Sequence, residues 1–202
     1  MDKELIDKIC NACRFNNLGH LVKILGSHPI EESIVDDEGD TPLGIAIEKG
    51  CQTVASCLIK RNISINDPIG ANRYSPLHMC ILTAYPREGR KIAKELIKKG
   101  VDINARCLGK YTPLHFACIL KDRLEDARTL LKHGADINAT TDKGDNPLHC
   151  SLLIHAQIDL VEFLVSKGAD LNHKNNGGYT PLELAKHYGH FKIVKYLGGL
   201  HG

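Results

Sequence analysis

The sequence contains no tryptophan and only two methionines, and its aromatic residues together make up 5% of 202 residues. It also lacks a strong excess of either charge, because 26 lysines and arginines stand against 24 acidic residues, for a formal charge of +2. A chain without a strong basic field has no electrostatic means of recruiting nucleic acid or an anionic membrane surface. We therefore expect neither as a partner.

Long apolar runs are also missing, and none approaches the roughly 20 residues that span a bilayer. The acidic and amphipathic start, residues 1–5, does not resemble a signal peptide. Eight cysteines lie scattered, mostly beside Ala, Ile and Leu, which is typical of small buried thiols in a reducing compartment and not of a disulfide framework. We expect no membrane insertion and an intracellular protein, in the cytoplasm or the nucleus.

What the sequence does contain is a repeat of about 34 residues. A phrase of Thr, Ser or Asn followed by Pro-Leu occurs five times, with its prolines separated by 34, 37, 34 and 34 residues. A second phrase follows at a fixed lag, and its clearest copy reads Leu130-Leu-Lys-His-Gly-Ala-Asp-Ile-Asn138. A period of this length is typical of architectures in which one small unit is stacked on the next.

The physics of one unit follows from its residue types. Thr or Ser before Pro is a helix N-cap followed by the one helical position that loses nothing by lacking an N–H, so each phrase predicts the start of a short helix. A second helix follows, with apolar residues at helical spacing and a left-handed stop at Gly100, Gly134 and Gly168, or at Asn62. The polar, glycine-bearing stretch after each stop predicts a hairpin-like turn. Two such helices cannot bury their apolar faces alone, so the units must stack.

These phrases resemble the ankyrin repeat, whose Thr-Pro-Leu-His and Leu-Leu-x-x-Gly-Ala-Asp-x-Asn signatures recur along nearly the whole chain. Ala12 lies 34 residues before Ala46 and marks a degenerate first copy. The resemblance implies an all-α solenoid of helix-turn-helix units joined by β-hairpin-like loops, with degenerate capping repeats at both ends. We expect a single domain, 1–202, of six repeats with approximate bounds 1–35, 36–69, 70–106, 107–140, 141–174 and 175–202.

The third repeat departs most from the others. Its inter-helix turn carries about four extra residues within 84–89, and the preceding hairpin, 66–74, is one residue longer than its neighbours. Either a partner contacts these insertions or they are harmless surface additions. The glycine found two residues before other Thr-Pro steps is replaced by Arg73 and Lys110, so we expect those two hairpin tips to differ in shape. Tyr74 and Tyr111 stand beside these tips.

In proteins similar to this one, the residues seven and eight places after the Thr lie on a concave surface and are commonly polar. Here five of the six such residues in the three central repeats are aliphatic, which predicts an apolar strip of the kind that marks a partner site. The alternative is that the lengthened turns fold back and bury the strip. The candidate partner-binding residues are Leu82, Thr83, Ile119, Leu120, Leu153, Ile154, His187 and Tyr188, with Arg73, Tyr74, Lys110 and Tyr111 at the hairpins.

Catalytic and metal chemistry finds little support in the sequence. Cys10 and Cys13 form a Cys-x-x-Cys inside an expected helix, with no second pair at zinc-finger spacing. His78, His115 and His149 occupy the same repeat position, and the resemblance implies that such a histidine braces the hairpins. No phosphate loop, dinucleotide fingerprint, nucleophile elbow or zincin motif occurs. We predict no catalytic residues, metal or cofactor.

The sequence thus predicts a non-catalytic protein-protein interaction module, an adaptor or an inhibitor, that is a monomer by itself and binds a protein partner of unknown identity. Two alternatives stay open. One is a small scaffold with a metal- or thiol-dependent activity, and the other is a weak nucleic-acid binder that uses the lysines around Lys91 to Lys99.

Overall fold

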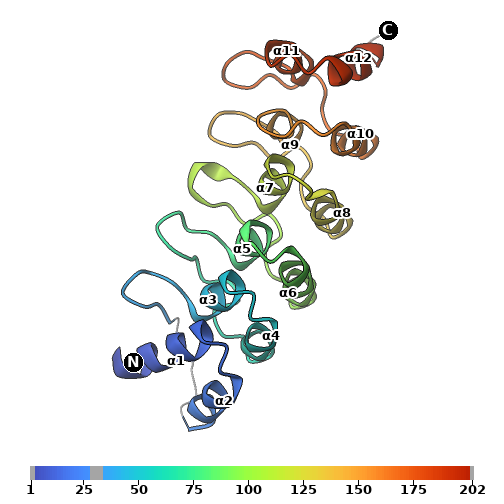
Figure 1. Ribbon diagram of the computed structural model, residues 1–202. Coiled ribbons are helices and arrows are strands. Elements are labelled where there is room, and N and C mark those ends of the chain that lie inside the picture. The colour runs from blue at the N-terminus through green and yellow to red at the C-terminus, as the bar shows by residue number, and fades with distance from the viewer. Residues whose placement is uncertain (1–2, 28–33, 201–202) are drawn as a thin grey trace. The chain divides into compact units, whose positions relative to one another are not determined.

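A computed structural model describes residues 3–27 and 34–200 of the chain. These residues form twelve α-helices and one short 3-10 helix, and they contain no β-strand (Figure 1). The chain divides into two compact units, Met1–Asp102 and Ile103–Gly202. We call them unit 1 and unit 2, and each is described by itself. No helix in the described ranges is both long and apolar enough to cross a membrane.

Unit 1 contains three helix pairs arranged in two layers (Figure 1). The inner layer packs α3 against both α1 and α5, while in the outer layer α4 contacts both α2 and α6. Residues 28–33, at the junction of the first two expected repeats, lie outside the described ranges. The helices of unit 1 are α1 (Lys3–Arg14), α2 (Leu18–Ser27), α3 (Pro42–Glu48), α4 (Gln52–Lys60), α5 (Pro76–Leu82) and α6 (Pro86–Lys98).

Unit 2 repeats this plan with α7, α9 and α11 as its inner helices (Figure 1). The inner helix α9 contacts both α7 and α11, and α12 contacts α10. The 3-10 helix η1 (Leu108–Lys110) lies in the hairpin-like loop before α7. The helices of unit 2 are α7 (Pro113–Ile119), α8 (Leu124–Lys132), α9 (Pro147–Cys150), α10 (Ile158–Ser166), α11 (Pro181–His187) and α12 (Phe191–Gly199).

The predicted helix starts are confirmed, because each proline of the repeated phrase is the first residue of an inner helix. At α3 the hydroxyl of Thr41 accepts a hydrogen bond from the N–H of Gly44, and at α11 Thr180 and Glu183 form a capping box. The predicted stops are also confirmed, since Asn62 and the three glycines after α6, α8 and α10 all have positive φ. The repeated phrase therefore defines both ends of the helix pairs.

The two hairpin tips without the glycine differ in shape from the others, as expected: the Arg73 hairpin closes through the bridge between Ile69 and Tyr74, and the Lys110 tip is a 3-10 turn with Gly109 also at positive φ. The substituted position itself, however, is unchanged in conformation. Arg73 and Lys110 have φ values of 55° and 59°, in the same left-handed region as Gly39, Gly144 and Gly178 at 81°, 75° and 79°. This one position therefore keeps its left-handed backbone conformation although the residue is no longer glycine. Such a conformation costs a residue with a Cβ about 1 kcal/mol relative to glycine.

Histidines of the repeated phrase brace the hairpins, as the resemblance implies. In unit 2 the Nδ1 atom of His115 accepts a hydrogen bond from the N–H of Thr112 at 3.0 Å. Its Nε2 atom then donates to the carbonyl oxygens of Ala139 and Asp145 at 3.1 and 3.2 Å. Burial lowers the pKa of His115 to about 4, so the ring is neutral at pH 7. Neighbouring hairpins are also joined directly, by a bond from the N–H of Asp142 to the carbonyl of Gly109 at 2.9 Å.

Candidate functional site

The part of the expected strip that belongs to unit 1 is largely closed. Thr83 is buried, with a relative exposure of 5%, and its hydroxyl donates to the carbonyl oxygen of Ile47 at 3.2 Å. The same hydroxyl accepts a hydrogen bond from the N–H of Tyr85. Leu82 is half-buried. Thr83 therefore joins its repeat to the preceding one and presents no surface to a partner.

The extra residues of the third repeat extend a helix and not a loop. Helix α6 has 13 residues, whereas α4 has 9, because Pro86 is well suited to begin a helix and Glu88 follows in its first turn. Glycine at position 89 allows the added turn to pack closely against α5, since a Cβ there would lie 2.4 Å from the carbonyl oxygen of Cys80. Tyr85 lies against Gly50 of the preceding repeat. The insertion thus contacts its neighbours through Tyr85 and Gly89, while residues 84–87 are exposed to solvent.

The two hairpin candidates of unit 1 differ in exposure. Arg73 is exposed at the tip, and Tyr74 is half-buried with its ring 6.0 Å from that of His78. The extra hairpin residue is accommodated between Ile69 and Tyr74, which form the one isolated β-bridge of the described residues. Tyr74 therefore packs on its own repeat.

In unit 2 the candidate residues at the ends of the inner helices are more open. Ile119, Leu120 and Leu153 are half-buried. Ile154 has a relative exposure of 63%, and Tyr188 one of 46%. The strip is therefore largely closed in unit 1 and half-buried in unit 2, where Ile154 is its exposed member.

A hollow of about 530 Å³ lies between the hairpins and the inner helices of unit 2. Its apolar and aromatic lining combines four residues expected from the sequence with two others, and consists of Tyr111, Leu153, Tyr179, Leu184, His187 and Tyr188. Its polar lining comes from the hairpins and includes Asp142, Lys143, Asp145, Asn175 and Asn176. Lys110, Ile119, Leu120 and Ile154 are not part of the lining.

Charge is distributed unevenly between the rim and the interior of this hollow. At the rim Lys110 lies 2.9 Å from the carboxylate of Asp142, and both side chains are more than half exposed, so the pair is strongly screened by solvent. Asp145 is buried, with a relative exposure of 5%, and its Oδ1 atom accepts a hydrogen bond from Nδ2 of Asn175 at 2.8 Å. Burial raises the pKa of Tyr111, which keeps the phenol neutral. A buried carboxylate thus lies in the same lining as the neutral phenol of Tyr111.

Asp145, Asn175 and Tyr179 are residues of the hollow that the list of expected site residues omits. The signal was present in the sequence, because the residue immediately before each Thr, Ser or Asn of the phrase is, in order, Asp40, Tyr74, Tyr111, Asp145 and Tyr179. The recurrence of tyrosine at this repeat position is evident from the sequence. Asp40 and Asp145 are found to share the position only when the repeats are aligned residue by residue.

Thiol chemistry is disfavoured by burial. Cys10 and Cys13 are buried in α1, and burial raises the pKa of Cys10 to about 12 and that of Cys13 further. Cys118, near His115 in sequence, is fully buried and its thiol pKa is also raised by burial. Since the thiolate is the reactive form, these three cysteines are poor nucleophiles and poor metal ligands.

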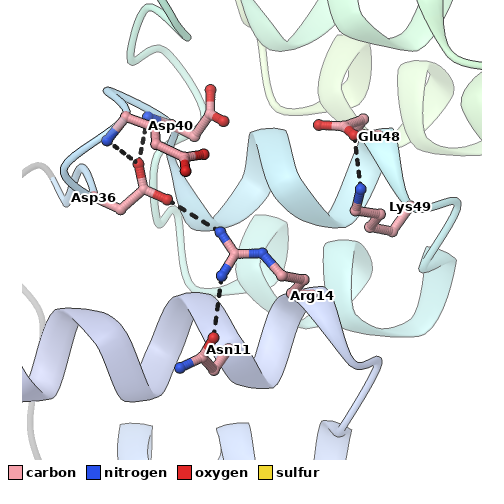
Figure 2. A network of polar contacts seen from close by, with 7 residues as sticks. Asn11, Arg14, Asp36, Asp40, Glu48 and Lys49 are labelled. Carbon is pink, nitrogen blue, oxygen red and sulfur yellow. Dashed lines mark hydrogen bonds and ion pairs between the residues drawn. The ribbon is translucent and has the colours of Figure 1, made fainter.

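One group of carboxylates in unit 1 has oxygen atoms within 4.8 Å of one another, those of Asp36, Glu38 and Asp40. Figure 2 shows that Asp36 is already engaged: its Oδ1 accepts from the N–H groups of Glu38 and Asp40, and its Oδ2 lies 3.4 Å from Arg14. In unit 2 the Oδ1 of Asn175 closes its own hairpin in the same way, two and four residues ahead. The carboxylate of Asp36 therefore closes a hairpin.

Comparison with known proteins agrees with this architecture. Family models for ankyrin repeats match residues 9–107 and 138–201 (three copies) and residues 96–150 (many copies). A stretch of 92 residues is 27% identical to alpha-latrotoxin-Lhe1a of Latrodectus hesperus, which covers 46% of this chain but only 6% of the toxin.

Among solved structures, the fold is similar to that of a chain in the complex of a predatory endopeptidase from Bdellovibrio bacteriovorus with an immunity protein. The TM-score is 0.79 at 22% identity, over 95% of this chain and 97% of that one. At this identity the likeness concerns the fold alone. With its repeated phrases, its paired helices and family models that match most of its length, the chain belongs to the ankyrin-repeat family.

Proposed function

We propose that this chain is a non-catalytic protein-interaction module, an adaptor or an inhibitor, that binds a protein partner through the hollow of unit 2 and the exposed side chains beside it. The observation that carries the proposal is the combination of a solvent-open hollow with exposed large side chains that line it or, for Ile154, directly follow a lining residue in the chain. Tyr179 and Tyr188 have relative exposures of 40% and 46%, and Ile154 one of 63%. Grouped exposed apolar side chains mark interaction sites, and tyrosine is enriched at binding hot spots.

The scaffold beneath the hollow suits recognition of a protein. Its hairpins are fixed by the buried bonds of His115 and by the bond between Asn175 and Asp145. A preorganised surface loses little conformational entropy when a partner binds. The solved structure of similar fold is that of an endopeptidase in complex with an immunity protein, which supports a protein partner. A cytoplasmic or nuclear location and a monomeric state remain predictions.

Affinity capture from cell lysate tests the proposal when a surface variant and a matched control are compared with the native chain. The surface variant combines Ile154→Asp with Tyr188→Ala, both at exposed positions, so little stability is lost. The control is Phe191→Ala, which removes the side chain with the highest exposure among the exposed large hydrophobics, 85%, at the first residue of an outer helix. Captured proteins are identified by mass spectrometry, and folding of every variant is checked by circular dichroism.

We expect at least one protein to bind the native chain and the Phe191→Ala control equally well and to be lost with the surface variant. Truncating a hot-spot residue typically weakens binding by about 2 kcal/mol or more, which is roughly thirtyfold. Equal capture by all three proteins would remove unit 2's hollow as the site. Loss with Phe191→Ala alone would move the site to the outer helices.

A further inference from the structure

The residues that immediately precede the helix N-cap in the three hairpins of unit 2 are Tyr111, Asp145 and Tyr179. Because they occupy one repeat position, they follow one another from hairpin to hairpin, and all three line the hollow. The repeat thus places a carboxylate between two phenol rings. Tyr188, from the end of α11, adds a third ring to the same lining.

Asp145 is held in place by its surroundings. Its N–H donates to the hydroxyl of Thr141 at 3.2 Å, and its carbonyl oxygen accepts from Nε2 of His115 at 3.2 Å. Its Oδ1 accepts a hydrogen bond from Asn175. Within residues 3–27 and 34–200, Asp145 forms no ion pair. A buried carboxylate with one neutral donor is incompletely compensated, so a cation that enters the hollow gains a strong electrostatic partner.

The other lining residues suit the two remaining parts of a cationic side chain, its charged head group and its methylene groups. Phenol rings attract cations to their faces, and the Tyr111 ring is fixed 5.9 Å from that of His115 and 5.5 Å from that of Phe116. Leu153 and Leu184 provide apolar contact for methylene groups. A planar guanidinium both stacks on aromatic faces and forms two parallel bonds to a carboxylate, whereas an ammonium does neither as well.

Basic groups near the hollow do not cancel this attraction. Lys110 is paired with Asp142 at the rim, and Lys143 is exposed, so solvent screens its charge far more than that of the buried Asp145. The volume of about 530 Å³ accommodates a long side chain together with part of its backbone.

We propose that this hollow binds an arginine side chain of the protein partner, with its guanidinium on the carboxylate of Asp145 and the tyrosine rings. This inference rests on the proposed function, because it names the chemistry by which the same site recognises its partner.

The test uses single-residue probes and the full chain. Nα-acetyl-arginine methylamide is titrated against the 15N-labelled protein, and amide chemical shifts are followed by NMR. Nα-acetyl-citrulline methylamide is the neutral control of nearly the same shape. The variant is Asp145→Asn, and its matched control is Asp40→Asn, the same substitution at the same repeat position in unit 1.

We expect the arginine probe to cause saturable shift changes confined to the lining of the hollow, with citrulline at least about tenfold weaker. Asp145→Asn should weaken arginine binding by at least about tenfold, and Asp40→Asn should leave it unchanged. The comparison of the two probes on the native chain remains decisive even if Asp145→Asn does not fold.

Equal affinity for the two probes, or no saturable shift up to about 50 mM arginine probe, would overturn the inference. An equal loss in Asp40→Asn would do the same. The capture experiment separates the two proposals. If capture of a partner requires Ile154 and Tyr188 but the arginine probe does not bind, the proposed interaction function is supported and the proposed recognition of arginine is refuted.

Discussion

Helix α5 of unit 1 ends differently from helices α9 and α11 of unit 2. In unit 1 the end of α5 is closed, because Thr83 bonds to the preceding repeat and the added turn of α6 lies on it. In unit 2 the ends of α9 and α11 leave Ile154 and Tyr188 exposed beside a hollow. Equivalent repeat positions therefore have opposite exposures.

The exposure of a side chain at the end of an inner helix therefore depends more on the segment that follows the helix than on the type of residue. A threonine at the end of α5 is buried, whereas an isoleucine at the equivalent place in unit 2 is mostly exposed. A repeat fixes where a side chain starts, and the following turn decides whether it is covered. An insertion can accordingly close one potential binding surface and leave another open.

The largest effect is expected from Gly89→Ala, which disrupts the packing of α6 on the end of α5. The new Cβ would lie 2.4 Å from the carbonyl oxygen of Cys80 and 2.8 Å from Cγ2 of Thr83, so α6 must move off α5. We expect a loss of about 3–4 kcal/mol in the free energy of unfolding. Urea denaturation followed by circular dichroism measures it.

Gly26→Ala is the matched control for this prediction. Gly26 lies in helix α2, where an added Cβ meets nothing within 4 Å. Alanine is a better helix former there and should stabilise by up to about 1 kcal/mol. If both substitutions had the same sign, the close approach of α6 to α5 would be refuted.

Acid should have the next largest effect, through the buried histidines of unit 2. Burial lowers the pKa of His115 from 6.5 to about 4 and also lowers that of His149. Because the unfolded state binds a proton at higher pH than the folded state, this stability is present above about pH 6.5 and is lost as the pH falls toward 4. His115 alone should account for roughly 3 kcal/mol of the loss.

Urea denaturation at several pH values between about 7 and 4 checks this expectation. His115→Gln should lower stability at neutral pH but reduce the dependence on pH by the share of that histidine. An unchanged pH dependence in the variant would show that His115 does not carry the effect.

The smallest effect concerns the hairpin tips, where each unit has one residue other than glycine at positive φ, Arg73 and Lys110. Lys110→Gly and Arg73→Gly should each stabilise by about 1 kcal/mol, because glycine adopts positive φ without strain. The exposed ion pair lost with Lys110 contributes little. Asn72→Gly, one residue before Arg73 and without a positive φ, should be neutral or destabilising in the same thermal melts.

Much of the fold could be predicted because the determinants are local. The residues Thr-Pro specify a cap and a first helical position, and a glycine specifies a left-handed stop, so the helices begin and end where the sequence indicates. The bracing role of His115 followed from resemblance and is confirmed. These features involve residues within one repeat or its neighbour.

The site was only partly predictable because exposure is decided by contacts between repeats. Nothing in the sequence around Thr83 shows that its hydroxyl reaches the carbonyl of Ile47, 36 residues earlier. The extra residues near Pro86 read as a longer turn, although they extend α6. Asp145 looks like an ordinary polar hairpin residue until stacking places it between two tyrosines.

The central claim is that unit 2's hollow binds a protein partner, and hydrogen–deuterium exchange of the chain with and without the captured partner tests it most directly. We predict slower exchange in the partner complex at residues 109–111, 142–145, 152–155 and 175–188, which surround the hollow. Protection confined to the outer helices α8, α10 and α12, or to unit 1, with exchange around the hollow unchanged, would contradict the account.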